Sequence, residues 1–172
     1  MERLYWDAIN VYDRKIFYTV TEKGLNFVGS PEHGVSQVLD FYDNDQFEYV
    51  HAHSQTDHYR KSLKRYLKGK RDHLEFKVDY LVDGTPQQET VWRKITTIPY
   101  GETRSLATLA AELDLGSDEV LDAMKKCPVW IAIPLHRVVD RGETNGFRTD
   151  VRMQQYLREI EQKPKSDLKE LL

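Results

Sequence analysis

The chain has 172 residues, of which 40% are hydrophobic and 31% charged, and its formal net charge is −3. This length fits one ordinary domain or two small ones, and the aromatic content excludes an intrinsically disordered chain. A general polyanion binder is excluded too, because such proteins are usually basic; any nucleic-acid contact requires a local patch. We expect a cytoplasmic protein without a membrane span, since neither a long apolar stretch nor a signal-peptide pattern is present.

The first half of the chain mixes strand and helix patterns. Residues 15–20 and 24–28 are rich in β-forming residues and are separated by a short polar link, which predicts a hairpin. Residues 35–42 indicate a short helix, and residues 57–68 indicate a longer one with an apolar stripe. Residues 74–80 alternate between apolar and polar side chains, which is typical of a strand with one buried face.

The second half is mostly helical. We therefore predict an α/β domain over residues 1–84, a helical domain over 85–163 and a charged tail over 164–172. Pro86 suits the first turn of a helix whose core face contains Val91, Trp92 and Ile95.

Three further helices are predicted. One begins after Ser105 as N-cap and ends near Leu113, and the next has Ser117 as N-cap. The core face of this second helix is predicted to contain Val120, Leu121 and Met124. Two short helices joined by a tight turn containing glycine are typical of a helix-turn-helix. The last helix is predicted over residues 151–160.

Several motifs of the second half occur in the order and spacing of one known family. They are the segment from Gly84 to Ser105, with its Ile98-Pro99-Tyr100-Gly101 tract; Cys127-Pro128; Pro134-Leu135-His136-Arg137-Val138; and Glu161. The chain thus resembles the O6-alkylguanine-DNA alkyltransferases. The resemblance implies an α+β protein, with an N-terminal ribonuclease-H-like α/β roll and a helical, winged-helix-like domain that contains the helix-turn-helix. It also implies a protein that flips an alkylated guanine out of DNA and transfers the alkyl group to its own cysteine.

The acceptor position departs from the family. The family's reaction needs a thiolate that is kept reactive by a histidine and a glutamate, which His136 and Glu161 match. Leu135, at the acceptor position, has no nucleophile. We therefore expect no alkyl transfer at this position, and we expect His136 and Glu161 to remain as a buried hydrogen-bonded pair.

Positions that face DNA in the family depart as well. The resemblance assigns this role to Ser105, Leu106, Asp118, Ala123, Lys125, Lys126, Arg137 and Arg148. Leu106 stands where the family has a tyrosine that presses on a phosphate, and Asp118 stands where an arginine enters the base stack. An acidic side chain is unfavourable near phosphates. Arg137 matches a residue that braces the active-site loop.

Three other features suggest chemistry. Cys127, the only cysteine, is a conceivable relocated acceptor, although a small buried hydrophobic residue is the simpler interpretation. His51 and His53 have a spacing compatible with a metal, but we interpret them as surface histidines and predict no metal site. Seven basic residues between 60 and 71 could bind an acidic partner, yet such a run is typical of the solvated face of an amphipathic helix.

Three functions follow from these observations. The first is a catalytically inactive DNA-binding protein of DNA repair, similar to the alkyltransferase-like proteins that bind alkylated DNA without the acceptor cysteine. The second is an interaction or regulatory protein that has lost DNA binding, and the third is an active alkyltransferase that uses Cys127. For the first we expect a monomer without cofactors whose partners are DNA and repair proteins.

Overall fold

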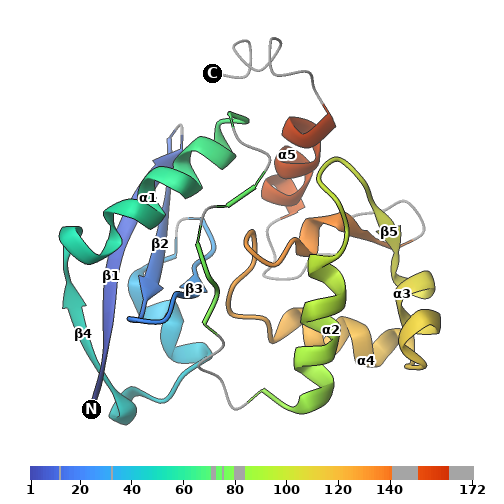
Figure 1. Cartoon of the computed structure of the whole chain (residues 1–172), viewed down its shortest axis with the longest axis horizontal. Helices are drawn as coiled ribbons and strands as arrows, with labels where there is room; N and C mark the ends of the chain where they lie inside the picture. The colour runs from blue at the N-terminus through green and yellow to red at the C-terminus, as the bar shows by residue number, and fades with distance from the viewer. Residues whose placement is uncertain are drawn as a thin grey trace. The chain divides into compact units, whose positions relative to one another are not determined.

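A computed structural model (Figure 1) describes residues 1–11, 13–31, 33–70, 73–74, 76–79, 84–140 and 151–162. The first of its two compact units contains Met1–Val82, and the second is Asp83–Gln162. The domain boundary predicted after residue 84 falls beside this division, and the predicted tail lies outside the described residues.

A four-stranded sheet forms the centre of the first unit, with the strand order β3-β2-β1-β4. Its strands are β1 (Glu2–Val11), β2 (Arg14–Val20), β3 (Leu25–Val28) and β4 (Phe47–His51). The first three strands are antiparallel neighbours, whereas β4 lies parallel to β1 at the edge. A parallel pair needs a long crossover, and the chain from β3 to β4 provides it.

Helical segments cover both faces of this sheet. Helix α1 (His53–Leu67) lies across β1 and β2, as Figure 1 shows, and Tyr18 of β2 donates to the Thr56 carbonyl of this helix. Two 3-10 helices, η1 (Val35–Asp40) and η2 (Asn44–Gln46), precede β4. A cluster on the other face joins the sheet to the η1 segment and contains Leu4, Phe27, Val38, Tyr42 and Phe47.

The hairpin of the first unit is confirmed, but other predictions needed correction. The helix predicted over 57–68 begins at His53, and the segment 35–42 forms a 3-10 helix. The strand predicted over 74–80 is wrong for the described residues of that segment, which contain only an isolated bridge between Val78 and Leu25. Alternating side chains indicate an extended backbone, but a strand also needs a neighbour with which to pair along its length. Strands β1 and β4 were not predicted from the sequence.

The second unit is mainly helical. Its helices are α2 (Pro86–Thr96), α3 (Leu106–Leu113), α4 (Ser117–Lys125), the 3-10 helix η3 (Leu135–Arg137) and α5 (Val151–Gln162). Two short strands, β5 (Arg104–Ser105) and β6 (Val138–Val139), pair in parallel. This pairing places the residues just before α3 beside the residues just after η3. The predicted winged-helix character stays a prediction.

Local capping sets the ends of these helices. The Thr85 side chain accepts from the Gln88 N–H, and the Gln88 side chain accepts from the Thr85 N–H, which makes a capping box at α2. Ser105 caps α3 as predicted, by accepting from the Thr108 N–H at 3.0 Å. The predicted cap of α4 is wrong: Gly116 is the N-cap, and Ser117 is the first helical residue.

The second unit is packed around α2 and α4. Val91, Trp92 and Ile95 are fully buried, as predicted, and the Trp92 indole donates to the Ala123 carbonyl at 2.8 Å. The buried residues of α4 are Val120, Ala123 and Met124, so Ala123 takes the core position predicted for Leu121. Among the described residues, no helix has the length and apolar character that a membrane span requires.

Candidate functional site

The tract from Pro134 to Val138 is buried in the second unit. Leu135 and His136 both have 0% of their surface exposed. The backbone turns tightly here, since the Arg137 N–H donates to the Pro134 carbonyl at 3.0 Å. Just upstream, Ile131 has a φ of 75°, a left-handed conformation that costs a β-branched residue about 1–3 kcal/mol. The surrounding packing therefore holds this loop in one conformation.

The carboxylate of Glu161, on α5, organises the site. Nε2 of His136 lies 2.8 Å from its Oε1, and the Arg137 guanidinium donates to the same carboxylate through Nε and Nη2. The Gly101 N–H points at Oε2 from 3.3 Å. A carboxylate is an acceptor, so it favours the tautomer of His136 that carries its proton on Nε2.

The loop around Gly101 approaches this carboxylate closely. Gly101 has a φ of 80°, and a Cβ at this residue would lie 3.2 Å from the Glu161 carbonyl oxygen. Nη1 of Arg137 donates to the Ile98 carbonyl at 2.7 Å, and the guanidinium lies 5.7 Å from the centre of the Tyr100 ring. Arg137 thus braces the loop from within, as the resemblance implies for this position.

Burial sets the protonation of His136. Removal from water lowers the pKa of this imidazole below its ordinary value of 6.5, while the hydrogen bond and negative charge of Glu161 oppose the shift. The net direction is downward, so His136 is neutral at neutral pH. A neutral imidazole beside a carboxylate could serve as a proton acceptor, but the adjacent side chain of Leu135 has no proton to give.

The predicted DNA-facing residues of α3 lie at its start. Ser105 is partly exposed, and its hydroxyl is engaged by Thr108. Leu106, the first residue of the helix, is buried with 4% exposure. Its side chain therefore packs into the second unit instead of standing on the surface.

The corresponding residues of α4 differ in exposure. Asp118, Lys125 and Lys126 are exposed, whereas Ala123 is 2% exposed. Lys126 forms an ion pair with Asp122, one turn earlier, at 3.1 Å. Arg148 lies outside the described residues.

A surface hollow lies between α4 and the start of α2. It is lined by Thr85, Pro86, Gln87, Gln88, Asp118, Glu119, Asp122, Ala123 and Lys126. Three of these side chains are acidic and one is basic, so the charge of the hollow is net negative. The first turn of α4 itself benefits, because acidic side chains favour a helix N-terminus.

Comparison with known proteins identifies the second unit. Residues 86–163 match the model of the 6-O-methylguanine DNA methyltransferase, DNA binding domain. An inducible methylated-DNA–protein-cysteine methyltransferase of Bacillus subtilis is 29% identical over 171 residues, which are 96% of this chain and 94% of the relative. The chain belongs to the methylated-DNA–protein-cysteine methyltransferase family.

One further relative and one solved structure are also similar to this chain. A Thermus thermophilus protein named DNA base-flipping protein is 32% identical over 91 residues, which are 52% of this chain and 61% of that protein. The crystal structure of Mycobacterium tuberculosis O6-methylguanine methyltransferase has the same fold, with a TM-score of 0.74, 23% identity and 100% of both chains covered. The α+β fold class predicted from the sequence is therefore confirmed.

Cys127 of this methyltransferase-family chain is buried with 0% exposure. Its N–H donates to the Met124 carbonyl just after α4. A buried thiol is the environment expected of a small core residue, and an alkyl donor reaches it only if this part of the unit opens.

Two histidines of the first unit, His51 and His53, lie close together. Both lie near Asp7 of β1, a residue for which no sequence pattern indicated a functional role. Asp7 is 44 residues away from His51 in the chain, and only the pairing of β1 with β4 brings the two together. The basic run lies partly on α1, where Arg60 and Lys61 both contact Asp57 at 2.8 Å.

Proposed function

We propose that this protein is a family member that binds DNA and serves DNA repair without accepting an alkyl group. The observation that carries the proposal is Leu135, which occupies the acceptor position inside an otherwise preserved network. Leucine has no lone pair or ionisable proton, so no neighbour can activate it. His136, Arg137 and Glu161 keep the hydrogen bonds that hold the loop.

DNA is the expected ligand because the helix-turn-helix of α3 and α4 falls within the segment that matches the family's DNA-binding domain. A relative of this segment is named for base flipping. A protein that flips a base without transferring its alkyl group can still mark the damaged site for other repair proteins. The basic side chain of Lys125, exposed at the end of α4, is the candidate phosphate contact of this helix.

Binding to matched duplexes tests the proposal. One duplex contains a single O6-methylguanine, and its control contains guanine at the same position. Fluorescence anisotropy at low salt is expected to give tighter binding to the methylated duplex, and binding is expected to weaken as salt increases. Equal affinities would remove the damage recognition from the proposal.

A second function is favoured by the acidic hollow between α2 and α4. Asp118, Glu119 and Asp122 repel phosphates, which suits a protein that keeps the fold for an interaction with another protein. The same anisotropy titration separates the two functions. Absence of binding to either duplex at low micromolar protein and low salt would support this second function and contradict the first.

An active alkyltransferase that uses Cys127 is the third function to test. Intact-mass spectrometry after incubation with the methylated duplex would detect one added methyl group. We expect an unchanged mass, since the thiol is buried. A gain of one methyl group that disappears in Cys127→Ser would establish transfer and contradict the proposal.

A further inference from the structure

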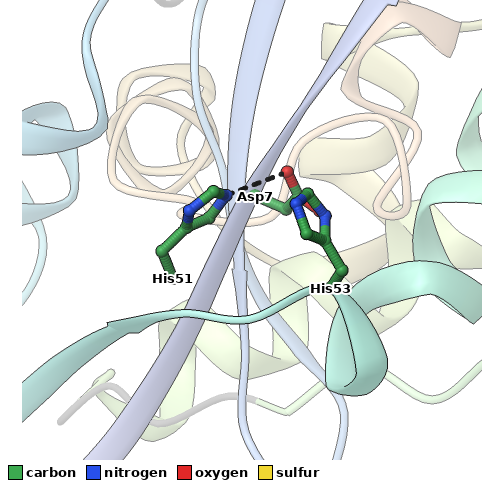
Figure 2. A group of neighbouring side chains, drawn as sticks. All are labelled: Asp7, His51 and His53. Atoms are coloured by element: carbon green, nitrogen blue, oxygen red, sulfur yellow. Dashed lines mark hydrogen bonds and ion pairs between the residues drawn. The ribbon is translucent and has the colours of Figure 1, made fainter.

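Three polar side chains of the first unit converge from separate elements (Figure 2). Asp7 lies on β1, His51 ends β4, and His53 begins α1. The parallel register pairs Trp6 with His51, so the next residue of β1, Asp7, lies beside the junction between β4 and α1. Nε2 of His51 is 3.5 Å from Oδ1 of Asp7, and Nδ1 of His53 is 2.8 Å from Oδ2.

We propose that Asp7, His51 and His53 bind a divalent transition-metal ion of the Zn²⁺ class. Two imidazole nitrogens and one carboxylate oxygen are ligands that Zn²⁺ prefers, and water would complete a four-coordinate site. One potential ligand atom from each residue lies within 4.8 Å of the others. Tetrahedral bonds of about 2.0–2.1 Å place ligand atoms about 3.4 Å apart, so small ring movements complete the geometry.

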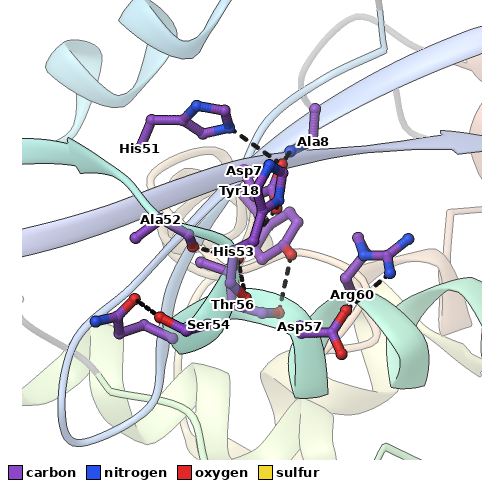
Figure 3. Close-up of polar contacts among 11 residues, drawn as sticks. Asp7, Ala8, Tyr18, His51, Ala52, His53, Ser54, Thr56, Asp57 and Arg60 are labelled. Carbon is purple, nitrogen blue, oxygen red and sulfur yellow. Dashed lines mark hydrogen bonds and ion pairs between the residues drawn. The ribbon is translucent and has the colours of Figure 1, made fainter.

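Asp7 is the rigid member of this site. Asp7 is 5% exposed, its carboxylate accepts from the Ala8 N–H at 2.8 Å, and the Thr56 hydroxyl lies 3.1 Å from Oδ2 (Figure 3). Burial alone would raise the pKa of Asp7, but the hydrogen bonds from Ala8, His53 and Thr56 hold it below its ordinary value. Metal-bound carboxylates are commonly oriented by such secondary hydrogen bonds.

The two histidines are the adjustable members. The His51 side chain is 48% exposed and the His53 side chain 74% exposed, so solvent reaches both rings. His51 stacks on Trp6 with ring centres 4.3 Å apart, which restrains the plane of its ring, and the centres of the two histidine rings are 4.9 Å apart. An ion has an open path to the site and needs no displacement of the core.

A bound ion would cross-link three elements. It would tie the β4–α1 junction to β1, because each of these elements provides one ligand. Binding to the folded state alone raises the melting temperature in proportion to the logarithm of the free ion concentration. This expectation concerns the first unit and is independent of whether the second unit binds DNA.

Titration of the full-length, untagged chain with Zn²⁺ tests the proposal. After treatment with EDTA and desalting, isothermal calorimetry is expected to show one Zn²⁺ bound per chain. His51→Ala and His53→Ala should each weaken binding at least tenfold and abolish the Zn²⁺-dependent rise in melting temperature. His33→Ala is the matched control, because it removes another exposed histidine outside the cluster and should leave binding unchanged.

The type of ligand provides a second test. X-ray absorption at the zinc edge is expected to show nitrogen and oxygen at about 2.0–2.1 Å and no sulfur at about 2.3 Å. A sulfur ligand would assign the ion to Cys127 and overturn the proposal, as would unchanged affinity in both histidine variants. The two exposed histidines are the residues to substitute, because Asp7→Asn would also disturb buried hydrogen bonds.

Discussion

The buried carboxylate of Glu161 joins parts of the second unit that are far apart in sequence. It receives hydrogen bonds from His136 and Arg137, and the Gly101 N–H points at it from the loop before α3. The residue before His136 is Leu135, which is fully buried and has no reactive group. The network therefore contributes to stability independently of any reaction at position 135.

Removing this carboxylate is expected to destabilise the protein strongly. Glu161→Ala leaves the buried guanidinium of Arg137 without its counter-charge, which costs about 3–5 kcal/mol. Glu159→Ala, on the exposed side of α5, removes the same side chain at a solvated position and should change stability by less than about 0.5 kcal/mol. Urea denaturation of both variants measures the difference, and similar losses would contradict the structural role of Glu161.

Acid is expected to destabilise the protein through His136. Burial lowers the pKa of this imidazole in the folded state, so the unfolded chain binds its proton first as the pH falls below 6.5. The stability that His136 contributes is therefore present above pH 6.5 and is lost as the pH falls toward the lowered pKa. The slope from this one group is at most about 1.4 kcal/mol per pH unit.

The variant His136→Gln isolates this contribution, because glutamine does not titrate. Urea denaturation between pH 7.5 and pH 5.5, a range of about two units around the ordinary histidine pKa, should give a shallower pH dependence for the variant than for the parent protein. Parallel curves would show that the pKa of His136 is the same in the folded and unfolded states, which would contradict the lowered pKa.

Helix α4 begins without a side-chain cap, unlike α3 before it. Ser105 supplies its hydroxyl to the Thr108 N–H, whereas Gly116 has no side chain to offer and Ser117 is already helical. The turn between the two helices includes Asp114, whose φ of 55° is a left-handed conformation that Asp tolerates better than most residues. The two serines therefore differ in their contribution to stability.

The serine difference is measurable with one substitution at each position. Ser105→Ala removes a cap and should cost about 1 kcal/mol of unfolding free energy. Ser117→Ala removes an exposed hydroxyl from the first helical position and should stay within about 0.5 kcal/mol of the parent protein. If thermal or urea denaturation gave the larger loss for Ser117→Ala, the assignment of Gly116 as the N-cap would be wrong.

Charge on α4 is expected to limit the affinity for DNA. Asp118→Arg replaces an exposed acidic side chain in the first turn with a basic one, so it should strengthen duplex binding and steepen the logarithmic salt dependence by about one. Glu159→Arg makes the same change of charge on α5 and controls for net charge. An affinity gain of equal size in both variants would argue against a DNA-facing position for Asp118.

At the scale of the whole molecule, the net charge of −3 opposes association with any polyanion. A binder with six to ten phosphate contacts loses about 10³–10⁵ in affinity between 50 and 200 mM salt. We expect this protein to make fewer than about five such contacts, and hence to lose less than about a thousandfold. Anisotropy titrations across this salt range measure the slope, and a steeper loss would contradict the small number of phosphate contacts expected here.

The two units differ in how well their elements could be predicted. Helices of the second unit carry local signals, such as Pro86 after its capping threonine and the apolar spacing of Val91, Trp92 and Ile95. These signals act within a few residues, so a sequence displays them directly. In the first unit, pairing between distant segments decides which extended segments become strands. Segment β4 is a strand because β1 lies beside it, whereas residues 76–79 pair with β3 only through a bridge at Val78.

The sequence by itself determined that position 135 cannot accept an alkyl group, because nucleophilicity is a property of the side chain and Leu135 has none. It also determined the family and the α+β class, since the motifs keep their order and spacing. The resemblance also implied the pair of His136 and Glu161, whereas only the tertiary structure placed Asp7 beside His51 and His53. Glu161 reaches His136 and Asp7 reaches His53 through contacts between distant segments, and such contacts exist only once strands pair and helices pack.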